Sequence, residues 1–266
     1  MSLPAWSAAF EDLDEVPALP LPEPAREWAW AGSTGAGVKV GVIDSGVDAD
    51  HLAVGALAGS VVVKADPDAE SGVRYVEGPH DDLVGHGTAC AGIIRAIAPD
   101  VELYSIRVLG ENLKGKGALL LGGIEWAIDH GMDVVNMSLS SKSDNLFAPL
   151  HDVADEAYFG RTLLVCAANN VPGPTYPSQF ASVISVAATQ GTDPRHLAYN
   201  PNPPVEFAAI GIDIEVPWTG GSIVATGNSF AAPHVAGLVA LIRAKHPELT
   251  AFQVKSVLLA VSANAR

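Results

Sequence analysis

The chain has 266 residues, of which 48% are apolar, so it is long enough for one large α/β domain, or two small ones, with a substantial core. Its formal net charge is −15, and a field of that sign repels phosphate backbones and anionic lipid, which makes nucleic acid and membrane surfaces poor candidate partners. No apolar run reaches the roughly 18 residues that span a bilayer.

The first segment of the chain is acidic and rich in proline. Residues 1–30 contain five prolines and six acidic residues and are predicted to form an extended arm outside the core. They lack the basic start and the apolar stretch of a signal peptide, so we expect a cytoplasmic protein, or a secreted one if a leader has been removed. The remaining residues, 31–266, are predicted to form a single domain.

From residue 38 onward, short apolar runs alternate with helical spacing. In chain order we expect a strand at 38–44, a polar loop at 60–82, a helix at 85–98, a strand at 101–109, a helix at 118–131 closed by Gly131, a strand at 133–139, a helix at 146–160, strands at 162–168 and 182–188, a helix at 229–246, and a last helix at 250–262 capped by Thr250. This alternation favours a three-layer, doubly wound α/β fold, with a mostly parallel sheet and helices on both faces. Functional residues of such sheets gather at the carboxyl ends of the strands.

Three polar residues stand where a core does not need them. Asp44 ends the first strand, His86 lies between two glycines at a helix start, and Ser229 opens another helix. If they meet in space, His86 can take the Ser229 proton while Asp44 holds the imidazole and stabilises its cation. Taken singly, each also has an ordinary explanation: a turn-forming aspartate, a structural histidine and a helix cap.

The segments around these residues carry a more specific signal. DSGVDADH (44–51), GHGTACAG (85–92) and GNSFAAPHVAG (227–237) together resemble the three active-site signatures of the subtilase family of serine proteases. GIEWAIDHGMDVVNMSLS (123–140) is similar to the family's central helix and substrate-binding strand. The resemblance implies a subtilase catalytic domain over 31–266. It also implies an endopeptidase that cleaves peptide bonds through an acyl-enzyme intermediate, with Asp44, His86 and Ser229 as catalytic residues.

The resemblance also implies the groups that bind the substrate. VCAANN (165–170) looks like the strand end that carries an oxyanion-binding asparagine, at Asn169, with the backbone N–H of Ser229 as second donor. Asn170 fits that role less well because of its spacing from the strand. The substrate should lie as an extended peptide between residues 138–140 and residues 113–117. The implied substrate-binding residues are Ser138, Leu139, Ser140, Ser141, Ala167, Ala168, Asn170 and Thr175.

Several positions depart from the family pattern. Ala89 stands in place of a second histidine and is followed by Cys90, and Asn228 stands in place of a threonine. SLSS (138–141) stands in place of the commoner SLGG, and its added side chains narrow the expected substrate pocket. The short link after the helix at 85–98 leaves no room for a calcium loop, and Ala53 stands where relatives have an aspartate. We therefore expect no tight calcium site and no cofactor, with a weaker cation site near residues 176–181 as an open alternative.

Other interpretations stay open at this point. The chain could bind peptides without cleaving them, or mature a peptide precursor with narrow specificity; an unrelated α/β hydrolase needs G-x-S-x-G, which the GNSFA around Ser229 does not offer. We expect a monomer whose partner is a polypeptide substrate.

Cys90 and Cys166 are expected to be buried free thiols, and no Cys/His spacing indicates a zinc site. The acidic arm lies either near the substrate groove, regulating access, or along the surface.

Overall fold

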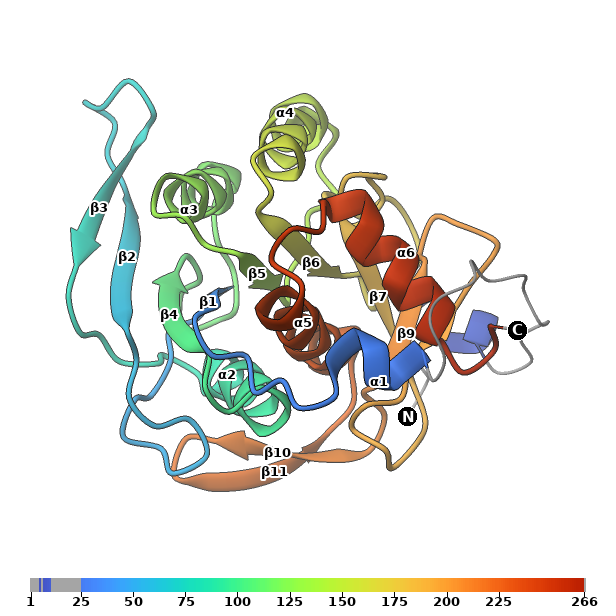
Figure 1. Ribbon diagram of the computed structural model, residues 1–266. Helices are drawn as coiled ribbons and strands as arrows, with labels where there is room; N and C mark the ends of the chain where they lie inside the picture. The colour runs from blue at the N-terminus through green and yellow to red at the C-terminus, as the bar shows by residue number, and fades with distance from the viewer. Residues whose placement is uncertain (1–4, 6, 11–24, 266) are drawn as a thin grey trace.

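The computed structural model describes Ala5, residues 7–10 and residues 25–265 (Figure 1). Its strands are β1 (Lys39–Asp44), β2 (Gly59–Ala65), β3 (Val73–Glu77), β4 (Glu102–Arg107), β5 (Val134–Met137), β6 (Leu163–Ala167), β7 (Ile184–Thr189), β8 (Ala198–Tyr199), β9 (Phe207–Ile210), β10 (Ile214–Trp218) and β11 (Gly221–Ala225). Its helices are η1 (Ser7–Phe10), α1 (Ala25–Trp30), α2 (His86–Ile97), α3 (Gly117–Asp129), η2 (Asp144–Leu146), α4 (Phe147–Phe159), α5 (Asn228–Lys245) and α6 (Ala251–Val261).

One large sheet organises the molecule, in the order β3-β2-β4-β1-β5-β6-β7-β9-β8. All neighbouring pairs are parallel except β2 with β3 and β8 with β9, at the two edges. Strands β10 and β11 form a separate antiparallel ribbon. The predicted doubly wound, mostly parallel sheet is therefore confirmed.

Helices cover both faces of this sheet. Figure 1 shows α3 and α4 on one face, and α2 and α5 on the other, with α1 and α6 against α5. The apolar side chains of the two faces form two separate buried clusters, and the central strands contribute alternate residues to each: Val40 and Val42 of β1 belong to one cluster, Ile43 to the other. Central strands buried on both faces explain why these segments read as continuous apolar runs.

The element boundaries follow local signals in the sequence. Gly131, with φ +66°, follows α3 in the left-handed conformation that ends helices. Thr250 caps α6 in a reciprocal pair with Gln253, since each side chain accepts from the other residue's backbone N–H. Both predicted helix ends are confirmed.

Two expectations from the sequence are wrong. Residues 60–82 are not a plain loop, because β2 and β3 pair antiparallel there as an edge hairpin with many exposed side chains. The arm does not extend to residue 30: α1 packs Ala29 and Trp30 into the core, and Trp28 stacks on His246 with ring centroids 4.1 Å apart. Residues 11–24, the most acidic part of the arm, lie outside the described residues.

The sheet places the candidate site at its carboxyl edge. Asp44 is the last residue of β1, Ser138 follows β5, and Ala168 follows β6. Because β1, β5 and β6 are adjacent and parallel, their ends meet on one side of the molecule.

Among the described helices, none is both long enough and apolar enough to cross a membrane.

Candidate active site

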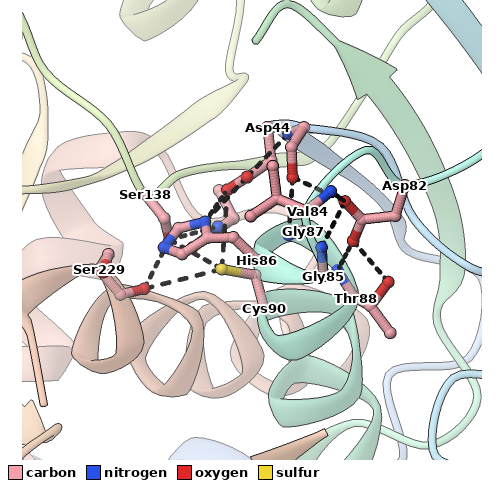
Figure 2. A network of polar contacts seen from close by, with 12 residues as sticks. Asp44, Asp82, Val84, Gly85, His86, Gly87, Thr88, Cys90, Ser138 and Ser229 are labelled. Atoms are coloured by element: carbon pink, nitrogen blue, oxygen red, sulfur yellow. Dashed lines mark hydrogen bonds and ion pairs between the residues drawn. The ribbon is translucent and has the colours of Figure 1, made fainter. Parts of the chain in front are cut away.

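Asp44 and His86 form a tight buried pair. His86 Nδ1 lies 2.8 Å from Asp44 Oδ1 and 2.9 Å from Oδ2, and both residues are almost fully buried (Figure 2). An ionised carboxylate only accepts hydrogen bonds, so Nδ1 carries the proton and, in the neutral ring, Nε2 is left with a free lone pair. The histidine is thus held in the tautomer that can act as a base.

Burial and charge act in opposite directions on His86. Burial lowers the pKa of the imidazole, but the charge of Asp44 and the hydrogen bond to it, with a smaller contribution from the charge of Asp82, outweigh burial and leave the pKa above its ordinary value. The rings of Phe230 and Trp218 lie beside the imidazole, with centroids at 5.3 Å and 6.5 Å. A paired aspartate in an apolar surround therefore makes His86 a stronger base.

Two glycines let the chain bring His86 to Asp44. Gly85 has φ +108°, a conformation that residues with a side chain rarely adopt, and it immediately precedes α2. A Cβ on Gly87 would collide with the carbonyl oxygen of Gly46. Gly87 is therefore required by the close approach between α2 and the loop after β1, and Gly85 by its backbone conformation.

Asp82 holds the start of α2, a role that the sequence analysis missed. Its Oδ1 accepts from the backbone N–H groups of Val84 and Gly85 and from the Ser45 hydroxyl, and its Oδ2 accepts from the N–H and hydroxyl of Thr88 (Figure 2). Burial raises the pKa of Asp82, but these hydrogen bonds outweigh it and leave the pKa below its ordinary value. Asp82 thus caps α2 from outside the helix.

We expect Asp82→Ala to cost about 2 kcal/mol of unfolding free energy, because it leaves several partly buried donors without their acceptor. Urea unfolding at neutral pH measures the cost, and Asp81→Ala, at the exposed neighbour, is the matched control. Since the folded pKa of Asp82 is lower than the unfolded value of 3.8, its contribution is full above that value and disappears as pH falls through the folded pKa. Equal stabilities of the two variants at neutral pH would contradict this role.

Ser229 stands in the first turn of α5. Position 233, four residues on, is a proline, which has no N–H to bond the Ser229 carbonyl oxygen as a helix normally would. The hydroxyl of Ser138 takes that place, donating to the Ser229 oxygen at 2.7 Å, and the Cys90 sulfur lies 3.7 Å from the same oxygen. A proline in the helix thus ties Ser229 to the end of β5.

Ser229, His86 and the ends of β5 and β6 line one pocket of about 250 Å³. Its other lining residues are Leu109, Leu113, Ser138, Leu139, Ser140, Ala167, Ala168, Asn169 and Asn170. Within the described part of the chain, no hydrogen bond joins the Ser229 hydroxyl to His86; bonds of this kind often close only when substrate is bound. The structure therefore brings the three predicted catalytic residues to one site.

A sequence profile described as the subtilase family matches residues 35–265. The chain belongs to the subtilase family. It is 34% identical to subtilisin DY of Bacillus licheniformis over 88% of this chain and 86% of that protein. It is 35% identical to subtilisin E of Bacillus subtilis over 84% of this chain but only 60% of that protein.

A solved structure agrees with this assignment. The crystal structure of a cold adapted subtilisin-like serine proteinase superposes with a TM-score of 0.69 at 27% identity, covering 97% of this chain and 91% of that one. The subtilase is thus homologous to serine endopeptidases in sequence and in fold.

Two of the predicted substrate-binding residues of the subtilase are not in the Ser229 pocket. Thr175 is fully buried, and its hydroxyl accepts from the Asn169 backbone N–H at 3.0 Å, so it supports the pocket wall from behind. The backbone N–H and carbonyl oxygen of Ser141 both hydrogen-bond the backbone of Tyr176. Ser141 lines a second, adjoining pocket instead. The other predicted residues line the pocket.

Asn228 lies behind Ser229 rather than in the pocket. Its side-chain amide donates to the carbonyl oxygens of Ala168, Asn169 and Ala5, and its Oδ1 accepts from Ala188 at 2.8 Å. In the arm, Ala5 accepts from the Asn228 amide and donates its N–H to the carbonyl oxygen of Asn170, a pocket-lining residue, at 2.8 Å. Ala5 does not line the pocket.

The thiol of Cys90 completes the rear of the site. Its sulfur is 3.1 Å from Ser138 Oγ and 3.8 Å from Asp44 Oδ2, close enough that Asp44, His86 and Cys90 form a group of three potential metal ligands. Burial and the nearby charge of Asp44 raise the pKa of Cys90 well above its ordinary value, so the sulfur is a protonated thiol and a poor ligand. Cys166 is also buried and free, as predicted for both cysteines.

A lysine occupies the region left open for a weak cation site. Lys255 Nζ donates to the carbonyl oxygens of Ala181 and Val183 at 2.8 and 3.2 Å, and pairs with Glu206 at 2.6 Å. The Ala181 carbonyl oxygen is therefore already used by a cationic side chain. The weak cation site near residues 176–181 stays an untested alternative.

Proposed function

We propose that this subtilase is an active serine endopeptidase in which Ser229 is the nucleophile, His86 the base and Asp44 the residue that orients the base. The observation that carries the proposal is the pair of short hydrogen bonds from His86 Nδ1 to Asp44, in a pocket that also contains Ser229. Its substrates are polypeptides, as family membership implies.

The reaction follows from these positions. His86 Nε2 takes the proton of the Ser229 hydroxyl as the oxygen attacks the peptide carbonyl carbon, and Asp44 stabilises the imidazolium that forms. His86 then gives the proton to the leaving amine, which breaks the C–N bond and leaves an acyl group on Ser229. Water, activated by His86 in the same way, hydrolyses the ester and restores the free serine.

The proposed mechanism gives the oxyanion two hydrogen-bond donors. The Ser229 backbone N–H is in the first turn of α5, where N–H groups have no partner inside the helix. Asn169 lines the pocket, and its Oδ1 accepts from the Val171 N–H at 3.3 Å, so its amide nitrogen remains available as the second donor. Asn170 Oδ1 also accepts from a backbone N–H, that of Asn228 at 2.9 Å, so hydrogen bonding does not separate the two asparagines, and the choice of Asn169 rests on the family resemblance.

We expect kcat/KM to rise with pH through a single ionisation whose midpoint lies above the ordinary histidine value of 6.5. Only the neutral imidazole accepts the Ser229 proton, and Asp44 raises the pKa of His86, so protonation removes activity at a higher pH than for a free histidine. Hydrolysis of a neutral peptide between pH 5 and 9, with circular dichroism to show that the fold persists, measures the profile. A rate that does not change over this range would contradict the role of His86.

The main competing function is peptide binding without cleavage. A fluorophosphonate probe separates the two, because it labels only a serine that a neighbouring base activates. We expect stoichiometric labelling together with loss of peptide hydrolysis. An unlabelled protein that still binds peptides in the groove would support the binding function instead.

The structure also bears on how selective the enzyme is. The Ser140 side chain lines a pocket of only about 250 Å³ whose other walls include Leu109 and Leu139. This small pocket, lined by both polar and apolar side chains, favours a narrow choice of side chain at the cleaved residue, in line with a precursor-processing role. Cleavage of a peptide library would show whether one class of side chain dominates at that position.

A further inference from the structure

Three adjoining hollows follow the substrate groove away from Ser229. The Ser229 pocket, of about 250 Å³, shares Leu109 and Leu113 with a second hollow of about 290 Å³. The second shares Lys114 and Lys116 with a third, of about 550 Å³. A peptide extended from Ser229 along the edge formed by residues 113–117 passes these hollows in turn.

Positive charge is concentrated along this path. The third hollow is lined by Lys64, Arg107, Lys114 and Lys116. Lys114 and Lys116 also line the second hollow. Among the residues that the structure describes, no aspartate or glutamate lines any of the three hollows. The whole chain has 30 acidic residues against 15 basic ones, so this concentration runs against the overall charge.

These four cations are not neutralised by acidic side chains of the described residues. Among the described residues, none of the four forms an ion pair. Arg107 donates to the backbone oxygen of Asp81 at 2.9 Å, which fixes its side chain without neutralising it. Lys114 is held at the end of a tight turn, with its carbonyl oxygen bonded to the Gly110 N–H and its own N–H bonded to Asn112 Oδ1.

The charge of the remaining surface adds to the effect. A strongly acidic protein repels acidic peptides everywhere except at such a groove, where the local field attracts them and orients their approach. A neutral or basic peptide gains nothing comparable from the same four side chains. The groove is therefore complementary to a negative segment of substrate.

We propose that Lys64, Arg107, Lys114 and Lys116 select substrates with acidic side chains on the residues that precede the cleaved bond. The proposal rests on the proposed function, because it takes Ser229 as the point of cleavage. It identifies the substrate class as peptides with an acidic segment upstream of that bond.

Matched internally quenched peptides test the proposal. They are identical except for Glu, Gln or Lys at one upstream position, varied in turn, and kcat/KM is measured for each. We expect Glu to exceed Gln by about tenfold at the best positions at low salt, with Lys below Gln. We expect this ratio to shrink toward one as salt rises from about 0.02 M to about 0.5 M.

Variants locate the effect in the groove. Lys114→Gln and Lys116→Gln should each lower the Glu/Gln ratio severalfold, and the double variant should nearly abolish it. Arg195→Gln removes an equal charge from an exposed position outside all three hollows and should leave the ratio unchanged. Because the readout is a ratio, general damage to catalysis cancels.

Two results would overturn the inference: equal rates for Glu and Gln at every position, or a ratio that Arg195→Gln lowers as much as the groove variants do. In both, hydrolysis of the Gln peptide would show that the protease function stands. Absence of hydrolysis of every peptide would instead reject the proposed function itself.

Discussion

Ser229→Ala is expected to lower kcat on a peptide substrate by about four to six orders of magnitude while the protein remains folded. Without the hydroxyl there is no nucleophile, and what remains is the rate enhancement from binding and from the oxyanion donors. The backbone of residue 229 is not altered by the change, so its carbonyl can still accept from Ser138. Thermal unfolding checks the fold, and peptide hydrolysis measures the loss.

The matched control for this variant is Ser222→Ala, at an exposed serine of β11 that lines none of the pockets described here. It should have the activity of the parent protein. If Ser229→Ala kept more than a tenth of the activity, another residue would have to be the nucleophile.

Asp44→Asn is expected to lower kcat by about 10⁴ at neutral pH with little change in the fold. An asparagine amide has the size of the carboxylate but no charge, and its NH₂ group favours the wrong tautomer of His86. Because the charge of Asp44 is the main contribution that raises the pKa of His86, its removal should also move the midpoint of the pH profile to lower pH. The dependence of kcat/KM on pH measures both effects.

Asp50→Asn provides the comparison, since Asp50 belongs to the same sequence motif but is exposed. We expect it to have parent activity and an unshifted pH midpoint. Retention of activity by Asp44→Asn, or an unshifted midpoint in its residual activity, would contradict the function assigned to the Asp44–His86 pair.

The central layers of the fold were predictable because their sequence signals are strong. Residues 38–44 form a continuous apolar run because β1 is buried on both faces of the sheet, and α5 and α6 show clear starts. The hairpin of β2 and β3 was missed because it lies at an edge, where exposed polar residues resemble a loop. Helix α1 was missed because the preceding prolines masked the two tryptophans that anchor it.

The site was predictable where a residue's role depends on local sequence and less so where it depends on packing. The three signatures indicated Asp44, His86 and Ser229, and the structure brings these together. Thr175 was predicted to contact substrate, but it hydrogen-bonds the Asn169 backbone from inside the core. The cap formed by Asp82 had no recognisable pattern, since it reaches α2 from outside the helix.

The most direct test of the account is a pre-steady-state measurement with a p-nitrophenyl ester, followed by peptide mapping of the trapped protein. We predict a burst of one equivalent of nitrophenolate and a single acyl group on Ser229, with no burst from Ser229→Ala. A linear release without a burst, together with no trapped acyl group, or an acyl group on any other residue, would contradict the assignment of Ser229 as the nucleophile of an acyl-enzyme mechanism.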